Sequence, residues 1–373
     1  MKIQSYIRRF GIGILAALWL VGCSGGAAKT AETAVQESSA VESTEAESAG
    51  KADEAGQSTG ADSGKTEEGK SGEASAAGET SGEVSDVDRY EEIMDRSGDD
   101  GKLVMYFLDL EVSPAATDKS GDSTILISPD GKVMLLDAGH PECGPQVLEV
   151  LNALGIEKID YLVASHPHID HIGGIPEVIA NIPIEAAYAS YVEYTTQTYQ
   201  DYLDAIETCG AELQRLKTGD VIDFGDQVKI EILGPGEDIE YPADFPSNST
   251  QFLNNNSLLM KFVFGESTAL FGGDLYIAQE RDYIEQYGDA LHVDVAKADH
   301  HGKDTSNLKK WIKTVSPQVV VAMGDEMGSM DAYNNYVKQG ASYHHTLYDG
   351  IVKVIVDDKK NCEVIDQKDS WMN

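Results

Sequence analysis

The sequence predicts an α/β protein in which layers of sheet are covered by helices. About 270 residues, from 101 to 373, are available for one compact body. Along this body, short apolar runs of strand length alternate with segments of helical spacing, and no repeat of fixed period is visible. Interleaved strands and helices bury their apolar faces against one another in layers. We therefore expect a single domain over residues 101–373.

A hairpin is expected early in this domain, after an apolar strand at 103–110. Residues 123–128 contain the run Thr-Ile-Leu-Ile, and Pro-Asp-Gly follows at 129–131. Proline presets the backbone angle of a turn and glycine supplies the positive one. The chain should therefore return as a strand over residues 132–136.

The remaining segments alternate between the two types. A helix with regular apolar spacing should stop at Gly155, because glycine commonly ends helices. We expect helices at 146–154, 176–180, 198–209, 277–287 and 306–314, and strands at 159–164, 229–233, 258–264, 268–271, 293–296, 318–323 and 351–356.

Residues 1–23 have the pattern of an export signal. A cationic start precedes a mostly apolar stretch at 10–21, which is too short to span a bilayer comfortably. The run Leu-Val-Gly-Cys at 20–23 resembles a bacterial lipoprotein processing site, which predicts lipidation of Cys23 and an extracytoplasmic, membrane-anchored location. An ordinary cleaved signal, with Cys23 incidental, is the alternative.

Residues 24–100 are expected to be a disordered acidic linker. They consist largely of Ala, Ser, Gly, Glu and Thr, and such a composition cannot bury enough apolar surface to offset the ordering entropy. A flexible chain of this length reaches about 45–50 Å. The linker would therefore hold the folded domain away from a membrane.

The composition excludes some classes of partner and of fold. The chain has 28 Lys and Arg against 64 Asp and Glu, a formal net charge of -36, which argues against a broad basic surface for phosphate backbones. Beyond Cys23, three cysteines remain, at 143, 209 and 362, so at least one thiol is free or intermolecular. No Cys-x-x-Cys metal knot and no disulfide framework are present.

The segment Ser-His-Pro-His-Ile-Asp-His at 165–171 carries the main chemical signal. Pro167 disfavours helical backbone for His166, so His166 and His168 should lie in extended chain and point the same way. Asp170 and His171 must turn away and can serve a second centre nearby. Four ligand-type side chains within six residues at a strand end predict a metal site.

These residues resemble the metallo-beta-lactamase superfamily, whose signature is His-x-His-x-Asp-His after a strand. Within it, the similarity is to the hydrolase domain of ComEC-type DNA-uptake proteins and their stand-alone relatives. The matching stretches are Leu-Leu-Asp-Ala-Gly (135–139), the histidine motif with its two glycines (165–174), Asn-Asn-Asn-Ser-Leu-Leu (254–259), Leu-Phe-Gly-Gly-Asp (270–274) and Ala-Asp-His-His-Gly (298–302). The resemblance extends over residues 103–356 and implies a four-layer αββα sandwich.

The resemblance also implies a set of ligands for two divalent metal ions. His166 and His168 would bind the first ion, Asp170 and His171 the second, and Asp274 would bridge them. His300 is the preferred further ligand of the second ion, with His301 as a substrate or outer group, although the reverse assignment stays open. Asp137 would orient a ligating histidine from behind. Asp170, His301 and Asp137 are thus the predicted catalytic residues.

Two departures from the family pattern affect the predicted site. No histidine lies between residues 172 and 273, so the first ion should have fewer nitrogen ligands; Zn²⁺ is expected, with Mn²⁺ possible. Asn254 to Ser257 stand there instead, and Asn255 and Asn256 are either substrate contacts or part of a turn. The Gly-Gln-Gly-Asp element usual in the relatives appears here as residues 111–121 with extra residues, and only Gly-Asp-Ser at 121–123 is kept.

Two further residues are candidate substrate contacts. Lys303 follows the histidine pair, and a helix starting near Thr305 or Ser306 would add an anion-attracting N-terminus. Lys303 is alternatively a solvated side chain. Tyr194 either lines the mouth of a pocket or packs in the core.

The function predicted from these residues is an exported dinuclear metal hydrolase. A hydroxide shared by the two metals would attack a phosphoester or phosphodiester, either in nucleic acid or in a small cell-envelope ester. The acidic charge disfavours nucleic acid, and no protein partner can be inferred. The alternatives are a lactone, lactam or thioester hydrolase on the same fold, and a non-catalytic binding lipoprotein.

Overall fold

The computed structural model describes residues 88–370. The predicted signal peptide, the lipidation site Cys23 and the linker up to residue 87 lie outside the described residues. Over residues 88–370, no helix combines the length and the apolarity needed to cross a membrane.

The folded body begins earlier than predicted. Helix α1 (Tyr90–Met94) lies within the segment expected to be linker. Its apolar residues at positions 90, 93 and 94 share one face, and Ile93 is fully buried in the same core as Val104 and Tyr106. This short apolar face packs the segment against the domain.

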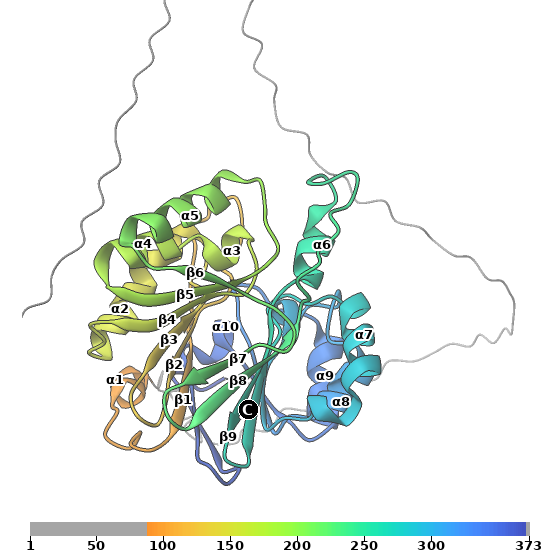
Figure 1. Ribbon diagram of the computed structural model, residues 1–373. Coiled ribbons are helices and arrows are strands. Elements are labelled where there is room, and N and C mark those ends of the chain that lie inside the picture. The colour runs from red at the N-terminus through yellow and green to blue at the C-terminus, as the bar shows by residue number, and fades with distance from the viewer. Residues whose placement is uncertain (1–87, 371–373) are drawn as a thin grey trace, which may run out of the picture. The chain divides into compact units, whose positions relative to one another are not determined.

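Two mixed sheets form the centre of the domain (Figure 1). The first has eight strands in the order β15-β14-β1-β2-β3-β4-β5-β6. Its strands are β1 (Leu103–Phe107), β2 (Thr124–Ile127), β3 (Val133–Leu136), β4 (Ile159–Ala164), β5 (Ile184–Ser190), β6 (Leu213–Leu216), β14 (Val352–Val356) and β15 (Cys362–Asp366).

The second sheet has seven strands in the order β13-β12-β11-β10-β9-β8-β7. Its strands are β7 (Val221–Phe224), β8 (Val228–Gly234), β9 (Leu259–Phe264), β10 (Ser267–Phe271), β11 (Val295–Lys297), β12 (Val319–Ala322) and β13 (Ser342–His345). In both sheets, antiparallel pairs give way to parallel pairs: β3, β4, β5 and β6 run parallel in the first, and β10, β11, β12 and β13 in the second.

Helices cover the outer face of each sheet (Figure 1). The helices along the first sheet are α2 (Gly144–Ala153), α3 (Ile169–Ile172), α4 (Ile175–Asn181) and α5 (Gln197–Cys209). Those along the second are α7 (Ile277–Tyr287), α8 (Lys309–Val315) and α9 (Met330–Lys338). The shorter elements are α6 (Ser249–Asn255), α10 (Thr346–Asp349) and the 3₁₀ turns η1 (Pro141–Cys143), η2 (Gly288–Leu291) and η3 (Asp299–Gly302).

Three apolar cores separate the four layers. One lies between the first sheet and its helices and contains Leu135, Leu151 and Leu162. Another lies between the two sheets, where the rings of Phe107 and Phe271 stack with centroids 5.8 Å apart. The remaining core packs the second sheet against its helices. The predicted αββα sandwich is therefore confirmed.

Most of the expected elements are present, with shifts at their ends. The predicted hairpin forms between β2 and β3, with Thr124 paired to Leu136. Several elements were not predicted because their apolar residues are sparse or irregularly spaced: β5, β6, β7, β13, β15, α6 and α9. The helix expected at 306–314 begins only at Lys309, and neither Thr305 nor Ser306 caps it.

Candidate metal centre

The ends of four strands meet at one edge of the paired sheets and carry the site. Strands β3 and β4 run parallel in the first sheet, and β10 and β11 run parallel in the second. Their carboxyl ends therefore lie at the same edges, where the chain places polar side chains in the next few residues. These residues are Asp137 after β3, His166 after β4, Asp274 after β10 and His300 after β11.

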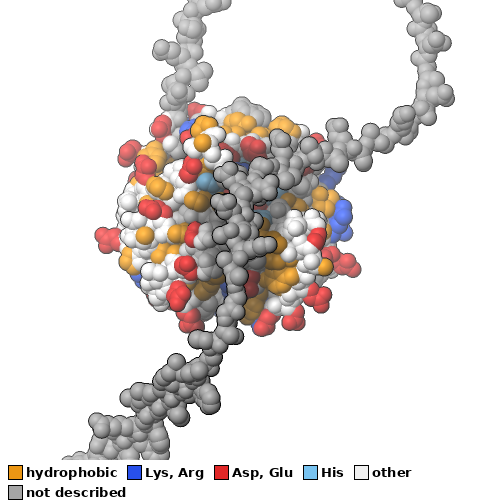
Figure 2. All heavy atoms as spheres, turned by 90° about the horizontal axis from the view of Figure 1, so that it is seen from above, with side chains coloured by type: hydrophobic (Ala, Val, Ile, Leu, Met, Phe, Trp, Pro, Cys, Tyr) orange, Lys and Arg blue, Asp and Glu red, His pale blue; other side chains and the backbone are white. Residues whose placement is uncertain are grey.

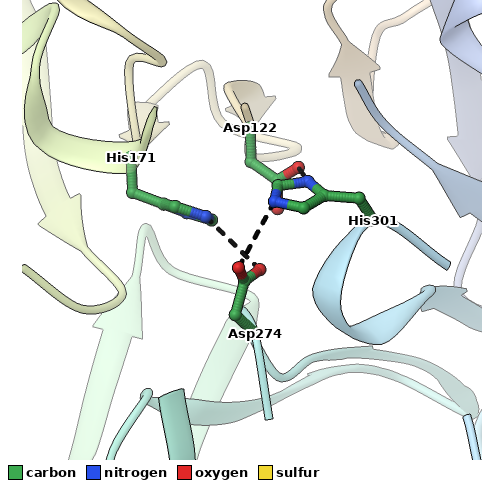
Figure 3. Close-up of side chains that lie close together, drawn as sticks. All are labelled: Asp122, His171, Asp274 and His301. Carbon is green, nitrogen blue, oxygen red and sulfur yellow. Dashed lines mark hydrogen bonds and ion pairs between the residues drawn. The ribbon is translucent and has the colours of Figure 1, made fainter. Parts of the chain in front are cut away.

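Four buried side chains form one compact donor cluster: Asp122, His171, Asp274 and His301 (Figure 3). The Nε2 atoms of His171 and His301 each lie 3.3 Å from a carboxylate oxygen of Asp274. Asp170 joins this group, with Oδ2 3.3 Å from His301 Nε2 and 4.0 Å from His171 Nε2. Two imidazoles and two carboxylates thus converge on one point.

A second group of imidazoles also approaches the carboxylate of Asp274. His166 Nε2 is 2.9 Å from His168 Nδ1 and 4.0 Å from Asp274 Oδ2. His300 Nε2 approaches the same oxygen at 3.7 Å. Oδ2 of Asp274 is thus shared by His166, His300 and His301, while Oδ1 faces His171.

The converging histidines are oriented by contacts on their other ring nitrogen. In four of them, Nδ1 contacts an outer side chain, which leaves Nε2 directed at the centre. The pairs are His166 with Ser165 at 3.0 Å, His171 with Asp137 at 2.8 Å, His300 with Thr305 at 2.5 Å and His301 with Asp122 at 2.9 Å. The expected position of Asp137 behind a ligand-type histidine is what the structure shows.

The carboxylates of the centre control the protonation of its histidines. Burial lowers the pKa of His171, but Asp274 and Asp170 raise it well above its usual value. Burial also lowers the pKa of His301, but the carboxylates of Asp274 and Asp122 raise it to about 10. For His166, burial and the nearby His171 hold the pKa well below its usual value. Metal binding at His171 and His301 would release protons.

The residues present fit divalent cations. The Nε2 atoms of His171 and His301 are buried without a hydrogen-bond partner, although both point at carboxylate oxygens. Such orphaned polar atoms are costly in a folded protein unless something occupies the space between them. Asp170, His171, Asp274 and His301 would hold one ion, and His166, His168, His300 and Asp274 the other.

The geometry favours the reverse assignment of the histidine pair, which the sequence left open. The ring centroids of His301 and His171 are 5.5 Å apart, and His301 Nε2 is 3.3 Å from Asp170 Oδ2, whereas His300 lines the cavity with His168. Both residues have positive φ, 47° and 55°, so the chain makes a left-handed turn here, which leaves His300 lining the cavity and His301 buried beside Asp122. The sequence could not reveal this turn, because consecutive histidines carry no signal of left-handed backbone.

Two residues of the centre were not predicted as site residues. Asp122 accepts the hydrogen bond of His301 Nδ1 at Oδ1, and its Oδ2 lies 2.5 Å from the ammonium of Lys297. Lys297 is 4% exposed and also approaches Asp274 Oδ1 at 3.4 Å. The signal in the sequence was Gly121-Asp122-Ser123, the part of the family element that the chain retains.

A cavity of about 280 Å³ opens beside the centre. Its lining includes His168, Asp170, Asp274 and His300, and also Tyr194, whose ring lies edge-on to His168 with centroids 6.0 Å apart. The position of Tyr194 agrees with its expected place at a pocket mouth. The other lining residues are Asp118, Lys119, Ile169, Thr196, Thr198, Thr250 and Asn254.

The remaining substrate candidates lie elsewhere. Asn255 and Asn256 form the end of α6, where Asn256 donates to the carbonyl of Phe252, and Asn254 lines the cavity instead. This supports the structural alternative for Asn256. Lys303 is absent from the cavity lining and pairs with Glu326 at 2.6 Å. The helix that follows starts too late to direct its N-terminus at the centre.

Comparisons with known proteins agree with this architecture. The model described as "Metallo-beta-lactamase superfamily" matches residues 117–238. Competence protein ComA of Neisseria gonorrhoeae is 27% identical over 226 residues, which cover 60% of this chain and 28% of that protein. ComE operon protein 3 of Bacillus subtilis is 24% identical over 184 residues, which cover 49% of this chain and 22% of that protein. The chain thus spans about a quarter of the length of these relatives.

Among solved structures, the metallo-beta-lactamase fold protein YhfI from Bacillus subtilis matches with a TM-score of 0.42 and 13% identity, over 69% of this chain and all of that one. The family match begins in the loop before Asp122 and includes the complete histidine motif at 166–171. Residues 117–238 are therefore similar to the metallo-beta-lactamase superfamily, and the buried donor cluster to which they contribute Asp122 and His171 fits a metal-dependent hydrolase.

Proposed function

We propose that this chain is an exported, membrane-tethered hydrolase that uses two divalent ions to cleave phosphoester bonds. The observation that carries the proposal is the pair of buried Nε2 atoms of His171 and His301, which have no hydrogen-bond partner and face the carboxylate of Asp274 beside an open cavity. Export and anchoring at Cys23 are supported by the signal-like pattern of residues 1–23.

Two divalent ions held side by side supply a hydroxide nucleophile at neutral pH and stabilise the charge that develops on the reacting ester. The chain's own residues prepare this centre. Asp137 and Asp122 accept the Nδ1 protons of His171 and His301, so that the Nε2 lone pairs point inward. Lys297 offsets part of the negative charge of Asp122 and Asp274.

The charge and the cavity favour a small phosphoester over a nucleic acid. Acidic side chains are spread over the face in Figure 2, and basic ones are confined to a few places. After residue 100, 44 acidic residues stand against 19 basic ones, which repels a long polyanion. A cavity of about 280 Å³ suits a small headgroup. Cleavage of nucleic acid is the second candidate, supported by the similarity to a protein named for competence.

The donor set favours Zn²⁺, with Mn²⁺ as the alternative. Four imidazole nitrogens at Nε2 and one at Nδ1 face the centre, and imidazole is a preferred ligand of Zn²⁺. Mn²⁺ is the alternative because the carboxylates of Asp170 and Asp274 also suit harder ions.

Metal content and turnover test the proposal together. The purified chain should bind about two equivalents of divalent metal and hydrolyse a generic phosphodiester. Asp274→Ala should abolish turnover while leaving the fold intact, as judged by circular dichroism. Asp226→Ala, on an exposed residue, is the control and should retain full activity.

The outcomes separate the alternatives. Full activity of Asp274→Ala would refute the assignment of the centre. A lactone or thioester cleaved faster than any phosphoester would favour the runner-up reaction. A chain that binds no metal would instead support a non-catalytic binding lipoprotein. For the two phosphoester candidates, a steep fall of binding with salt indicates a polyanion, and a shallow one a small ester.

A further inference from the structure

The loop between β1 and β2 brings a lysine to the wall of the cavity. Lys119 lies on this loop, and its ammonium is 4.0 Å from Asp170 Oδ2. Its side chain is 28% exposed, so it is neither fully buried nor free in solvent. Lys119 lines the cavity together with His168 and His300. It therefore presents a positive charge to whatever enters beside the metal centre.

The position of this loop is fixed by close packing. The amide of Asp122 donates to the carbonyl of Asp170 at 3.1 Å. A Cβ on Gly121, which has φ +74°, would lie 1.7 Å from that same carbonyl oxygen. The loop thus rests directly on the residue that would hold metal. This contact places the loop that carries Lys119 beside the metal centre.

A second ammonium group lies close to that of Lys119. The side chain of Lys303 contacts that of Lys119 and is also paired with Glu326. The two ammonium groups repel each other because they carry like charges. Such a pair stands out in a chain where acidic residues greatly outnumber basic ones. Once Asp170 is engaged by a cation, the charge of Lys119 has less compensation on the cavity side. An anion placed there would relieve both effects.

We propose that Lys119, supported by Lys303, binds an anionic oxygen of the substrate beside the bond that is cleaved. This inference rests on the proposed phosphoester hydrolysis and narrows its substrate class to small phosphoesters with two negative charges at or next to the reacting phosphorus. A phosphomonoester, or a chain end carrying a terminal phosphate, has this chemistry. A neutral ester offers Lys119 no anionic oxygen, and a singly charged diester offers only one charge, which the metal ions would also attract.

Kinetics on two matched substrates test this selectivity. The metal-loaded full chain is compared with Lys119→Met on p-nitrophenyl phosphate, a dianion, and on methyl p-nitrophenyl phosphate, a monoanion. Lys119→Met should raise the KM for the dianion about 10- to 100-fold, which is the range for loss of a charge-assisted hydrogen bond. The KM for the monoanion should change much less. Lys119→Arg should restore most of the selectivity. Lys309→Met, a change on α8, is the control and should leave the KM for both substrates unchanged.

Binding of inorganic phosphate, measured by calorimetry on the metal-loaded chain, gives a readout without turnover. Lys119→Met should weaken it about tenfold or more, Lys303→Met less, with metal content unchanged. Equal phosphate binding by Lys119→Met and the unmodified chain would overturn the inference. If the unmodified chain hydrolyses neither ester but Lys119 still governs phosphate binding, the proposed function fails and the anion site stands.

Discussion

Replacing Lys297 by Met tests whether a buried cation balances the carboxylates of the metal centre. The Lys297 ammonium lies 2.5 Å from Asp122 Oδ2 and 3.4 Å from Asp274 Oδ1, and it donates to the carbonyl of Gly273 at 2.6 Å. Methionine keeps much of the side-chain volume but removes the charge and the hydrogen bonds. Two buried carboxylates would then lose their shared partner.

The expected cost follows from that burial. Lys297 is 4% exposed and both carboxylates are 2–3% exposed. Breaking a buried ion pair on one side typically costs about 3–5 kcal/mol, because the remaining charge stays buried. We expect a loss of this size in the free energy of unfolding of the metal-free chain. Added Zn²⁺ should reduce the difference in free energy of unfolding between Lys297→Met and the unmodified chain, since cations at Asp274 would replace part of the missing charge.

The assay is urea unfolding in the presence of chelator and again with added Zn²⁺, analysed by linear extrapolation. Lys353→Met is the matched control: Lys353 is 1% exposed and pairs with Asp99 at 3.0 Å, outside the metal centre. It should lose comparable stability in both conditions. Two results would refute the reasoning. One is a free energy of unfolding of metal-free Lys297→Met within about 1 kcal/mol of that of the unmodified chain. The other is a difference between the two chains that stays the same when Zn²⁺ is added.

Three further changes have defined outcomes. Asp137→Asn should weaken metal binding about 10- to 100-fold by calorimetry, because Asp137 orients His171. Gly121→Ala should lower Tm and metal content together, since its Cβ would collide with the Asp170 carbonyl, beyond the roughly 1–2 kcal/mol cost of left-handed backbone. Cys143 should resist iodoacetamide at pH 8 in the folded chain, as detected by mass spectrometry, because burial raises the pKa of its thiol to about 12.

Each of these changes has a control within the chain. Asp160→Asn removes a buried carboxylate that pairs with lysines, and should leave metal affinity unaltered. Gly131 also has positive φ, but its Cβ would meet no atom within 4 Å, so Gly131→Ala should show backbone strain alone. Cys209 is exposed and should be alkylated in the folded chain. Matching behaviour of any variant and its control would contradict the corresponding prediction.

Local sequence patterns predicted those parts of the fold that depend on neighbouring residues. The hairpin between β2 and β3 follows from apolar runs on either side of Pro-Asp-Gly, a turn whose chemistry lies in its own residues. The histidine motif was equally readable, since Pro167 and the two-residue spacing determine how His166 and His168 point. Strands such as β15, with a half-exposed pattern, gave no such signal.

The sequence by itself determined that a metal-type donor set follows a buried strand, because those residues are adjacent in the chain. The tertiary structure alone decided which donors meet. Asp122 and His301 are 179 positions apart, and the pairing of Lys297 with Asp122 likewise joins distant segments. The different surroundings of His300 and His301 depend on left-handed backbone at both residues. Contacts of this kind arise from how two sheets pack, and residue order along the chain does not encode them locally.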